Sequence, residues 1–341
     1  MAQDKRGLIG VLLVNLGGPD SLHAVRPFLF NLFSDREIIR LGPSFLQKPL
    51  AYLISSLRSG KTRGAYALIG GKSPINEITR AQANALEQNL KGSTKDMQDL
   101  GVKVYIGMRY WNPFLEDVVR EIHGHGIRRL LVVSLYPHYS VATTGSSLSH
   151  LRKILAAYPG ITIHAVESWY DNPRYIDALA MQIRQGLETF GTKSGAGTPV
   201  RVQDIHLLFS AHSLPVKFIE EGDPYVEHIM GTIHAVAEKV SVPWSLSYQS
   251  KSGPVAWLEP STEQMLEELA RKGVKNLLVV PISFVSDHIE TLYEIDMLYK
   301  NMASDLGIHL ERTRSLNTAP EFIGALEEIV LKGIKEAEWA E

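Results

Sequence analysis

The chain has 341 residues, of which 45% are hydrophobic and 21% are charged, and its formal net charge at pH 7 is −2. The composition is ordinary for a globular protein, and the length predicts about two domains. A near-neutral charge without a basic block gives nucleic-acid binding no electrostatic support. Cysteine is absent, which excludes disulfides, thiolate zinc sites and cysteine-ligated iron–sulfur clusters. Any metal must therefore be held by histidine, carboxylate or hydroxyl groups.

The first apolar run, from Leu8 to Leu16, is interrupted by Gly10 and is short for a secretory signal. It is more typical of a first β-strand. No apolar run approaches transmembrane length. We therefore expect a cytoplasmic protein.

Strand-like apolar runs alternate with helical patterns along the chain, which predicts parallel sheets built from βαβ units. Four such runs fall in each half of the chain, at residues 8–15, 103–108, 130–135 and 161–166, and at 205–210, 245–249, 276–282 and 308–312. The sequence therefore predicts an α/β fold with four strands in each half.

The two halves are also similar in register. A shift of 147 residues takes Gly126 and the LLVV run after it onto Gly273 and a second LLVV run, and it takes Ile161 onto Ile308. One offset that holds over about sixty residues indicates a duplicated α/β domain. We expect two lobes with a cleft between them.

A row of acids follows the strand predicted at 276–282. Asp287, Glu290 and Glu294 are spaced three and four residues apart, so a helix would place their carboxylates on one face. Stacked carboxylates repel one another, and a metal ion or a stream of protons would offset that repulsion. A solvated helix start is the alternative. The shift of 147 places small neutral residues in the first half, which favours a functional row: Ser140, Thr143 and Ser147.

His212, in the run LLFSAHSLP, directly follows a predicted strand. Ligands bind at the carboxyl ends of parallel strands, and a histidine there can accept a proton or bind a metal. No GxSxG motif is present to support a serine nucleophile.

The run LVNLGGPDS lacks the GxGxxG and GK[ST] patterns of phosphate-binding loops. It is better explained as a tight turn, with Pro19 starting the next helix.

Three further runs at predicted strand ends, 107–113, 135–147 and 248–260, are rich in tyrosine and tryptophan and contain Arg109 and Lys251. Aromatic walls with a few cations suit a large, flat, anionic ligand. Core packing would explain some of these aromatic residues equally well.

The first half carries an insertion at about residues 35–80. Apolar residues recur there at helical spacing: Phe45, Leu46, Leu50, Leu53, Ile54 and Leu57. The resulting amphipathic helix would form a lip over the cleft or complete the core of the first domain, and the sequence leaves both alternatives open.

The chain contains seven motifs that occur in the same order in the ferrochelatase family, which it resembles over nearly its whole length: LVNLGGP, IGGKSPI, GMRYWNP, YPHYSVATTGSS, FSAHSLP, YQSKSGPVAWLEP and SDHIETLYEID. The resemblance implies two Rossmann-like lobes, each with a four-stranded parallel sheet flanked by helices, and an active-site cleft between them. It also implies a lyase that inserts Fe²⁺ into protoporphyrin IX to form protohaem, in the last step of haem biosynthesis.

On this resemblance the first lobe spans residues 1–170 with the lip insertion at about 35–80. The second spans 171–319 and carries His212 and Glu290, and residues 320–341 form a C-terminal helix that packs back on the first lobe.

The resemblance implies that His212 and Glu290 are the catalytic pair and hold iron. Three neighbours form a conduit for iron or protons: Asp287, His288 and Glu294. Five residues are implied to bind the porphyrin: Leu16, Arg109, Tyr110, Tyr139 and Ser140.

Leu16 stands where members that use coproporphyrin tend to have tyrosine, which favours protoporphyrin IX. We expect no cofactor beyond the substrate Fe²⁺, no iron–sulfur cluster, and a bacterial-type monomer or weak dimer. Contact of the lip with the inner face of the membrane is left open. The alternatives are a coproporphyrin ferrochelatase, a cobalt chelatase of the same fold, and a tetrapyrrole- or metal-binding protein without catalytic activity.

Overall fold

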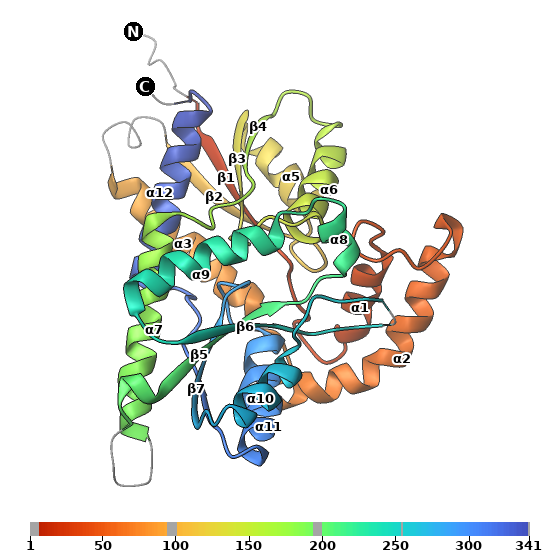
Figure 1. The fold of residues 1–341 in the computed structure, drawn as a ribbon. Coiled ribbons are helices and arrows are strands. Elements are labelled where there is room, and N and C mark those ends of the chain that lie inside the picture. Colours follow the sequence, from red (N-terminus) through yellow and green to blue (C-terminus); the bar gives the residue numbers. More distant parts are fainter. Residues whose placement is uncertain (1–6, 94–100, 194–199, 254, 340–341) are drawn as a thin grey trace. The chain divides into compact units, whose positions relative to one another are not determined.

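The computed structural model describes residues 7–93, 101–193, 200–253 and 255–339. This part of the chain divides into two compact units (Figure 1). The first unit runs to Trp169 and is completed by residues from Asn317 onward, and the second unit is Tyr170–Leu316.

The sheet of the first unit has four parallel strands in the order β2-β1-β3-β4. Their bounds are β1 Ile9–Asn15, β2 Val102–Met108, β3 Arg129–Ser134 and β4 Thr162–Val166. All seven residues of β1 are buried, because helices cover both faces of the sheet.

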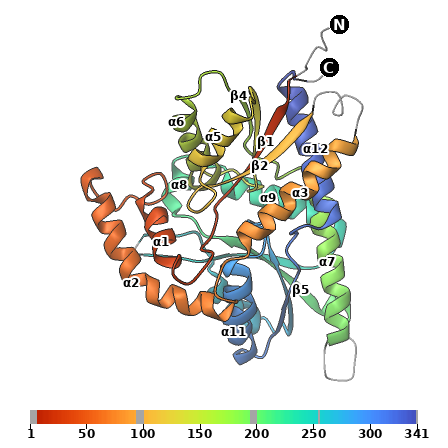
Figure 2. The same ribbon diagram turned by 180° about the vertical axis from the view of Figure 1, so that it is seen from behind.

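The helices of the first unit are α1 Val25–Ser34, α2 Gln47–Leu68, α3 Ile75–Ser93, α5 Leu115–Gly124, α6 Ser146–Leu155 and α12 Pro320–Glu336, with the short η1 Ser44–Leu46 and the π-helical η2 Val141–Gly145. Leu12 and Val14 of β1 share a core with α5 and α6. On the other face α12 lies beside α3, as Figure 2 shows. There a Cβ on Gly333 would lie 2.9 Å from Leu131, so glycine permits the close approach of α12 to the sheet.

The second unit repeats this arrangement in the strand order β6-β5-β7-β8, with β5 Ile205–His212, β6 Trp244–Gln249, β7 Asn276–Pro281 and β8 His309–Arg312. Its helices are α7 Pro173–Lys193, α8 Val216–Glu220, α9 Tyr225–Val240, α10 Thr262–Arg271 and α11 Lys300–Asp305, with η3 Val202–Asp204 and the π-helical η4 Glu290–Tyr299. The core on one face joins β5 and β7 to α10, η4 and α11. The predicted α/β fold with two four-stranded parallel sheets is confirmed.

The predicted duplication is also confirmed. Corresponding elements begin 147 residues apart, since α5 and α10 start at Leu115 and Thr262, and β3 and β7 start at Arg129 and Asn276. Each unit also has a π-helical segment after the third of its strands in chain order. The run of chain before these elements differs in length, and the first unit contains α2 there.

The glycine pair after β1 forms a turn that docks on the start of α3. Gly17 has φ +79°, a left-handed conformation that favours glycine. The backbone N–H of Gly18 donates to Oδ1 of Asn76 at 3.1 Å, and Nδ2 of Asn76 donates to the Gly18 carbonyl at 2.8 Å. A structural turn is therefore the better explanation of LVNLGGP. The expectation that Pro19 starts the next helix is wrong, because α1 begins only at Val25.

Replacing Gly18 with alanine should lower the free energy of unfolding by about 1–3 kcal/mol, because the new Cβ would lie 2.5 Å from Cβ of Ser73 and the two segments must move apart. Urea denaturation measures this change. Gly60→Ala on α2 is the matched control, since no atom lies within 4 Å of its added Cβ. Equal losses in the two variants would contradict this account of the turn.

Candidate active site

His212 is the last residue of β5, and its backbone is held on both sides. Its N–H donates to Oγ of Ser283 at 2.8 Å, and its carbonyl accepts from the Tyr225 hydroxyl at 2.9 Å. The imidazole side chain is 33% exposed. The strand end therefore fixes the position of a ring that solvent can still reach.

The Nδ1 atom of His212 faces the carboxylate of Glu290, the first residue of η4, at 3.0 and 3.1 Å from its two oxygens. Burial alone would lower the pKa of His212, but the charge of Glu290 and the hydrogen bond to it outweigh burial and raise that pKa above its usual value. Burial would raise the pKa of Glu290, and His212 and His288 together hold it below its usual value. The two shifts agree in favouring the charged pair. With Nδ1 engaged, Nε2 is the ring nitrogen left for a substrate.

Glu294 lies one turn further along η4, close to Glu290. Nε2 of Gln249 is 3.2 Å from Oε2 of Glu290 and 3.4 Å from Oε2 of Glu294. Oγ of Ser250 also donates to Glu294, at 2.6 Å. Burial and the neighbouring charge of Glu290 raise the pKa of Glu294 to about 7. One acid of this pair is thus strongly ionised, while the other can take up or release a proton near neutral pH.

His288 is buried beside the same pair. Its Nδ1 is 3.0 Å from the carbonyl oxygen of Ser286, which assigns a proton to Nδ1, and its Nε2 is 3.7 Å from Oε1 of Glu290. Among the described residues, none forms a hydrogen bond with this buried Nε2. The ring packs on Phe284, with centroids 4.2 Å apart. Glu290 therefore lies between two histidines.

Asp287 does not lie on the helix, so the predicted row of three acids on one helical face is wrong. The helix begins at Glu290, and Asp287 precedes it. Oδ1 of Asp287 accepts from Nη1 of Arg312 at 3.1 Å, from Ser315 Oγ at 2.7 Å and from Thr291 Oγ1 at 3.0 Å. Arg312, on β8, also forms a two-point ion pair with Asp296. Asp287 is thus paired with groups outside the helix, and of the three acids only Glu290 and Glu294 lie on η4.

In the first unit, Arg109 and Tyr110 follow β2 and converge on a buried acid, Asp35. Oδ2 of Asp35 accepts from Nη2 of Arg109 and the Tyr110 hydroxyl, each at 2.7 Å, and from Oγ of Ser146 at 2.5 Å. Burial would raise the pKa of Asp35, but the Ser146 hydrogen bond, the charge of Arg109 and the Tyr110 hydrogen bond outweigh burial and lower that pKa. Sequence reasoning missed Asp35, which lies 74 residues from Arg109 and matches no motif.

The other three predicted porphyrin residues lie at neighbouring strand ends of the first unit. Leu16 directly follows β1 and is partly buried, and Tyr139, also partly buried, lies between β3 and η2. Ser140 is fully buried, and its hydroxyl caps η2 by accepting from the N–H of Ala142 at 3.1 Å. The structure thus brings these residues to one edge of the first sheet, and their role in binding a porphyrin stays a prediction.

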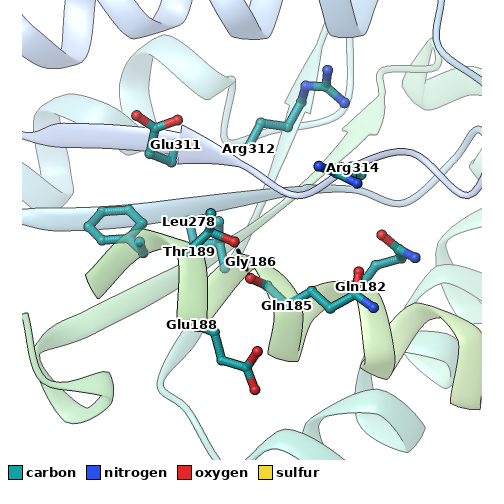
Figure 3. Close-up of a pocket in the computed structure, with 10 residues that line it drawn as sticks. Gln182, Gln185, Gly186, Glu188, Thr189, Leu278, Glu311, Arg312 and Arg314 are labelled. Carbon is teal, nitrogen blue, oxygen red and sulfur yellow. Dashed lines mark hydrogen bonds between the residues drawn. The ribbon is translucent and has the colours of Figure 1, made fainter. Parts of the chain in front are cut away.

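Figure 3 shows a pocket of about 310 Å³ in the second unit, between α7 and the strands β7 and β8. Its lining includes Arg312, which pairs with Asp287, but none of the residues predicted to be catalytic. Among the residues that the structure describes, no group of three or more histidine and carboxylate side chains could hold a metal ion.

Replacing Asp35 with asparagine should lower the free energy of unfolding at pH 7 by roughly 3 kcal/mol, because Arg109 would keep a buried charge without its partner. A carboxylate whose pKa is lowered by folding stabilises above its unfolded pKa, near 3.9, and this contribution is lost as the pH falls through the folded pKa. The difference between the variant and the wild type should therefore shrink below about pH 4.

Urea denaturation at several pH values measures this difference. Asp117→Asn is the matched control, since it breaks the exposed pair with Arg120 and should change little. A difference for Asp35→Asn that is as large at pH 3 as at pH 7 would contradict the ionised, hydrogen-bonded Asp35.

The chain is similar in sequence to one known protein family over most of its length. The model of the ferrochelatase family matches residues 8–334. The chain is 50% identical over 327 residues to the ferrochelatase of Geotalea uraniireducens, with 95% of this chain and 97% of the relative covered. It is 49% identical over 325 residues to the ferrochelatase of Desulfotalea psychrophila, with 95% and 96% covered.

Among solved structures, the fold is similar to that of the sirohydrochlorin chelatase SirB from Bacillus subtilis subspecies spizizenii in complex with cobalt. The TM-score is 0.53 at 12% identity, with 97% of this chain and 98% of SirB covered. At that identity the similarity concerns the fold alone, which is the two-unit chelatase fold. The sequence similarity extends over nearly the whole length of both the chain and its relatives, and the chain belongs to the ferrochelatase family.

Proposed function

We propose that this protein inserts Fe²⁺ into protoporphyrin IX and releases two protons, which forms protohaem in the last step of haem biosynthesis. The observation that carries the proposal is the pair of His212 and Glu290, with Nδ1 of the histidine 3.0 Å from the carboxylate and the ring partly exposed. Membership of the ferrochelatase family supplies the reaction class, a lyase that acts on a metal and a porphyrin.

Metallation requires two pyrrole N–H protons to leave and the nitrogen lone pairs to turn out of the plane of a flat ring. Binding energy is therefore spent on bending the porphyrin. When the ring is neutral, Nε2 of His212 can accept a pyrrole proton, because Glu290 stabilises the imidazolium that forms. The same lone pair would bind Fe²⁺ in the neutral ring. One nitrogen cannot do both at once, so iron binding and proton acceptance at His212 would have to follow one another.

Within the proposed conduit, His288 and Glu294 adjoin Glu290. Glu294 can exchange protons near neutral pH, which suits a group that passes released protons on. Asp287 is already neutralised by Arg312, so any part it plays in the conduit would require that ion pair to open.

Leu16 supports protoporphyrin IX as the substrate, and coproporphyrin is the second candidate. A cobalt chelatase or a tetrapyrrole-binding protein without activity are the remaining alternatives. The lack of cysteine supports a protein that works without an iron–sulfur cluster. Anaerobic incubation of the purified protein with Fe²⁺ or Co²⁺ and each porphyrin separates these alternatives. The cytoplasmic location and the monomeric or weakly dimeric state stay predictions.

We also propose that the first unit contacts a membrane surface through η1 and α2. The apolar stripe predicted at residues 45–57 is largely exposed, with Phe45 at 76%, Leu53 at 53% and Leu57 at 74%. The face of α2 that packs inward carries small or polar residues instead, namely Gln47, Ala51, Ser55 and Ser59. The interpretation that this stripe completes a core is therefore wrong. Among the residues described, no helix has the length and apolarity needed to cross a bilayer.

Replacing either His212 or Glu290 with alanine should reduce the rate of iron insertion by about 10²- to 10⁴-fold, because the reaction loses its proton acceptor or the charge that stabilises it. Protoporphyrin binding, followed by fluorescence, should persist in both variants. His206→Ala is the matched control, since His206 lies on the same strand and its ring is hydrogen-bonded to Ser245 instead of to the acids. Turnover at the wild-type rate in the His212 or Glu290 variant would remove this assignment.

Replacing both Leu53 and Leu57 with glutamine should weaken binding to phosphatidylglycerol vesicles by about tenfold or more, because apolar area no longer leaves water when the helix docks. Flotation with vesicles measures the binding. Iron insertion into detergent-dispersed protoporphyrin should be unchanged.

Val202→Gln, a substitution at an exposed apolar residue of the second unit, should leave vesicle binding as it was. If the wild type does not bind vesicles, or if the double variant binds as well as the wild type, the membrane proposal is wrong.

A further inference from the structure

Gln249 is the last residue of β6, and it pairs in register with His212 at the end of β5. Its side chain is buried, at 4% exposure, and reaches the two adjacent acids. Nε2 lies within 3.2 Å of a Glu290 oxygen and within 3.4 Å of a Glu294 oxygen. A single amide nitrogen, with two hydrogens, therefore serves two carboxylates.

The orientation of this amide is determined by chemistry. The ionised carboxylate of Glu290 only accepts hydrogen bonds, so the NH₂ group of Gln249 must face it. Its oxygen then accepts from Oγ of Ser210, at 2.5 Å, and Ser210 is buried at 2% exposure. In the flipped orientation, the amide oxygen would face both carboxylates, and the Ser210 hydroxyl would lose its acceptor. Ser210 thus locks Gln249 in the donating orientation.

An amide is suited to this place because it donates hydrogen bonds without carrying charge. A hydrocarbon there would leave buried carboxylate oxygens without donors. A lysine or arginine would neutralise the negative charge that attracts a divalent cation. The amide donates to Glu290 and Glu294 without cancelling the negative charge that they carry.

We infer that Gln249 is a positioning residue: its amide, oriented by Ser210, holds Glu290 against His212 and keeps Glu294 alongside as a second carboxylate for the incoming divalent cation. The catalytic consequence rests on the proposed iron insertion. The hydrogen-bonded bridge itself can be tested without it.

The test is a double-mutant cycle of Gln249→Met and Glu294→Gln, since methionine keeps the length of the side chain but donates nothing. Gln249→Met alone should lower kcat for iron insertion about tenfold and leave KM for protoporphyrin within about twofold. In the Glu294→Gln background the same change should cost less than about threefold, because Glu290 no longer has a like charge to be shielded from. Ser210→Ala should lower kcat in the same direction, by less.

The same cycle is read a second time from urea unfolding, which needs no activity. The unfolding equilibrium constant should change about tenfold for Gln249→Met in the wild type and clearly less in the Glu294→Gln background. If the Glu294→Gln variant is inactive, these unfolding measurements alone test the inference. Gln82→Met is the matched control, since Gln82 is a buried glutamine of the first unit that donates to the carbonyl of Asn317, and its loss should leave kcat unchanged.

Equal losses for Gln249→Met in both backgrounds, or an unchanged kcat in the single variant, would overturn the inference. If the wild-type protein inserts no iron, the proposed function fails, while the unfolding cycle still reports whether Gln249 couples the two acids. The two failures are therefore distinguishable.

Discussion

The hydrogen bond between Nδ1 of His212 and the Glu290 carboxylate is the constraint on which the candidate site of the second unit depends. It joins the last residue of β5 to the first residue of η4, which follows β7. Because β5 and β7 are parallel neighbours, their carboxyl ends meet at one edge of the sheet, where such folds bind ligands. A buried glutamate is costly unless it is compensated, and here His212, His288 and Gln249 surround it. The fold thus brings a buried acid together with a base that solvent can still reach.

The features that the sequence predicts are those that depend on residues close together along the chain. Apolar runs bounded by glycine or proline report local burial, so β7 starts at Asn276 as predicted and β5 runs only two residues past its predicted end. The repeat of 147 residues can be recognised in the sequence because these same apolar runs carry it. His212 and Glu290 each lie in a sequence motif, and the resemblance to the ferrochelatase family pairs them. The two residues are 78 positions apart in the sequence but hydrogen-bonded in the fold.

What the sequence could not predict depends on partners far along the chain. Asp287 has helical spacing to Glu290, yet it precedes the helix and accepts hydrogen bonds from Arg312 and Ser315, 25 and 28 residues later. Asp35 belongs to no motif, yet it holds Arg109 and Tyr110. Likewise, an amphipathic pattern does not say which face is buried. On α2 the small residues Ala51 and Ser55 pack inward, and the leucines remain outside. Gln249 did carry a signal, because it ends the strand beside the one that ends in His212.

The two copies of the domain treat a buried acid in opposite ways, and sheet register makes the comparison direct. Ile9 of β1 pairs with Arg129 as Ile205 of β5 pairs with Asn276, so Leu16 falls where the second copy has His212. By the same register the residue after β2, Arg109, falls where the second copy has Gln249.

In the first copy a permanent cation at this position closes an ion pair with Asp35, and little charge is left over. In the second copy a neutral amide stands between two acids, and no guanidinium at that position competes for them. An arginine in place of Gln249 would give the second site the same closed pair, with no reason to attract a divalent cation. At this edge of the sheet, the guanidinium of Arg109 neutralises the acid of the first unit, whereas the amide of Gln249 leaves the acids of the second unit charged.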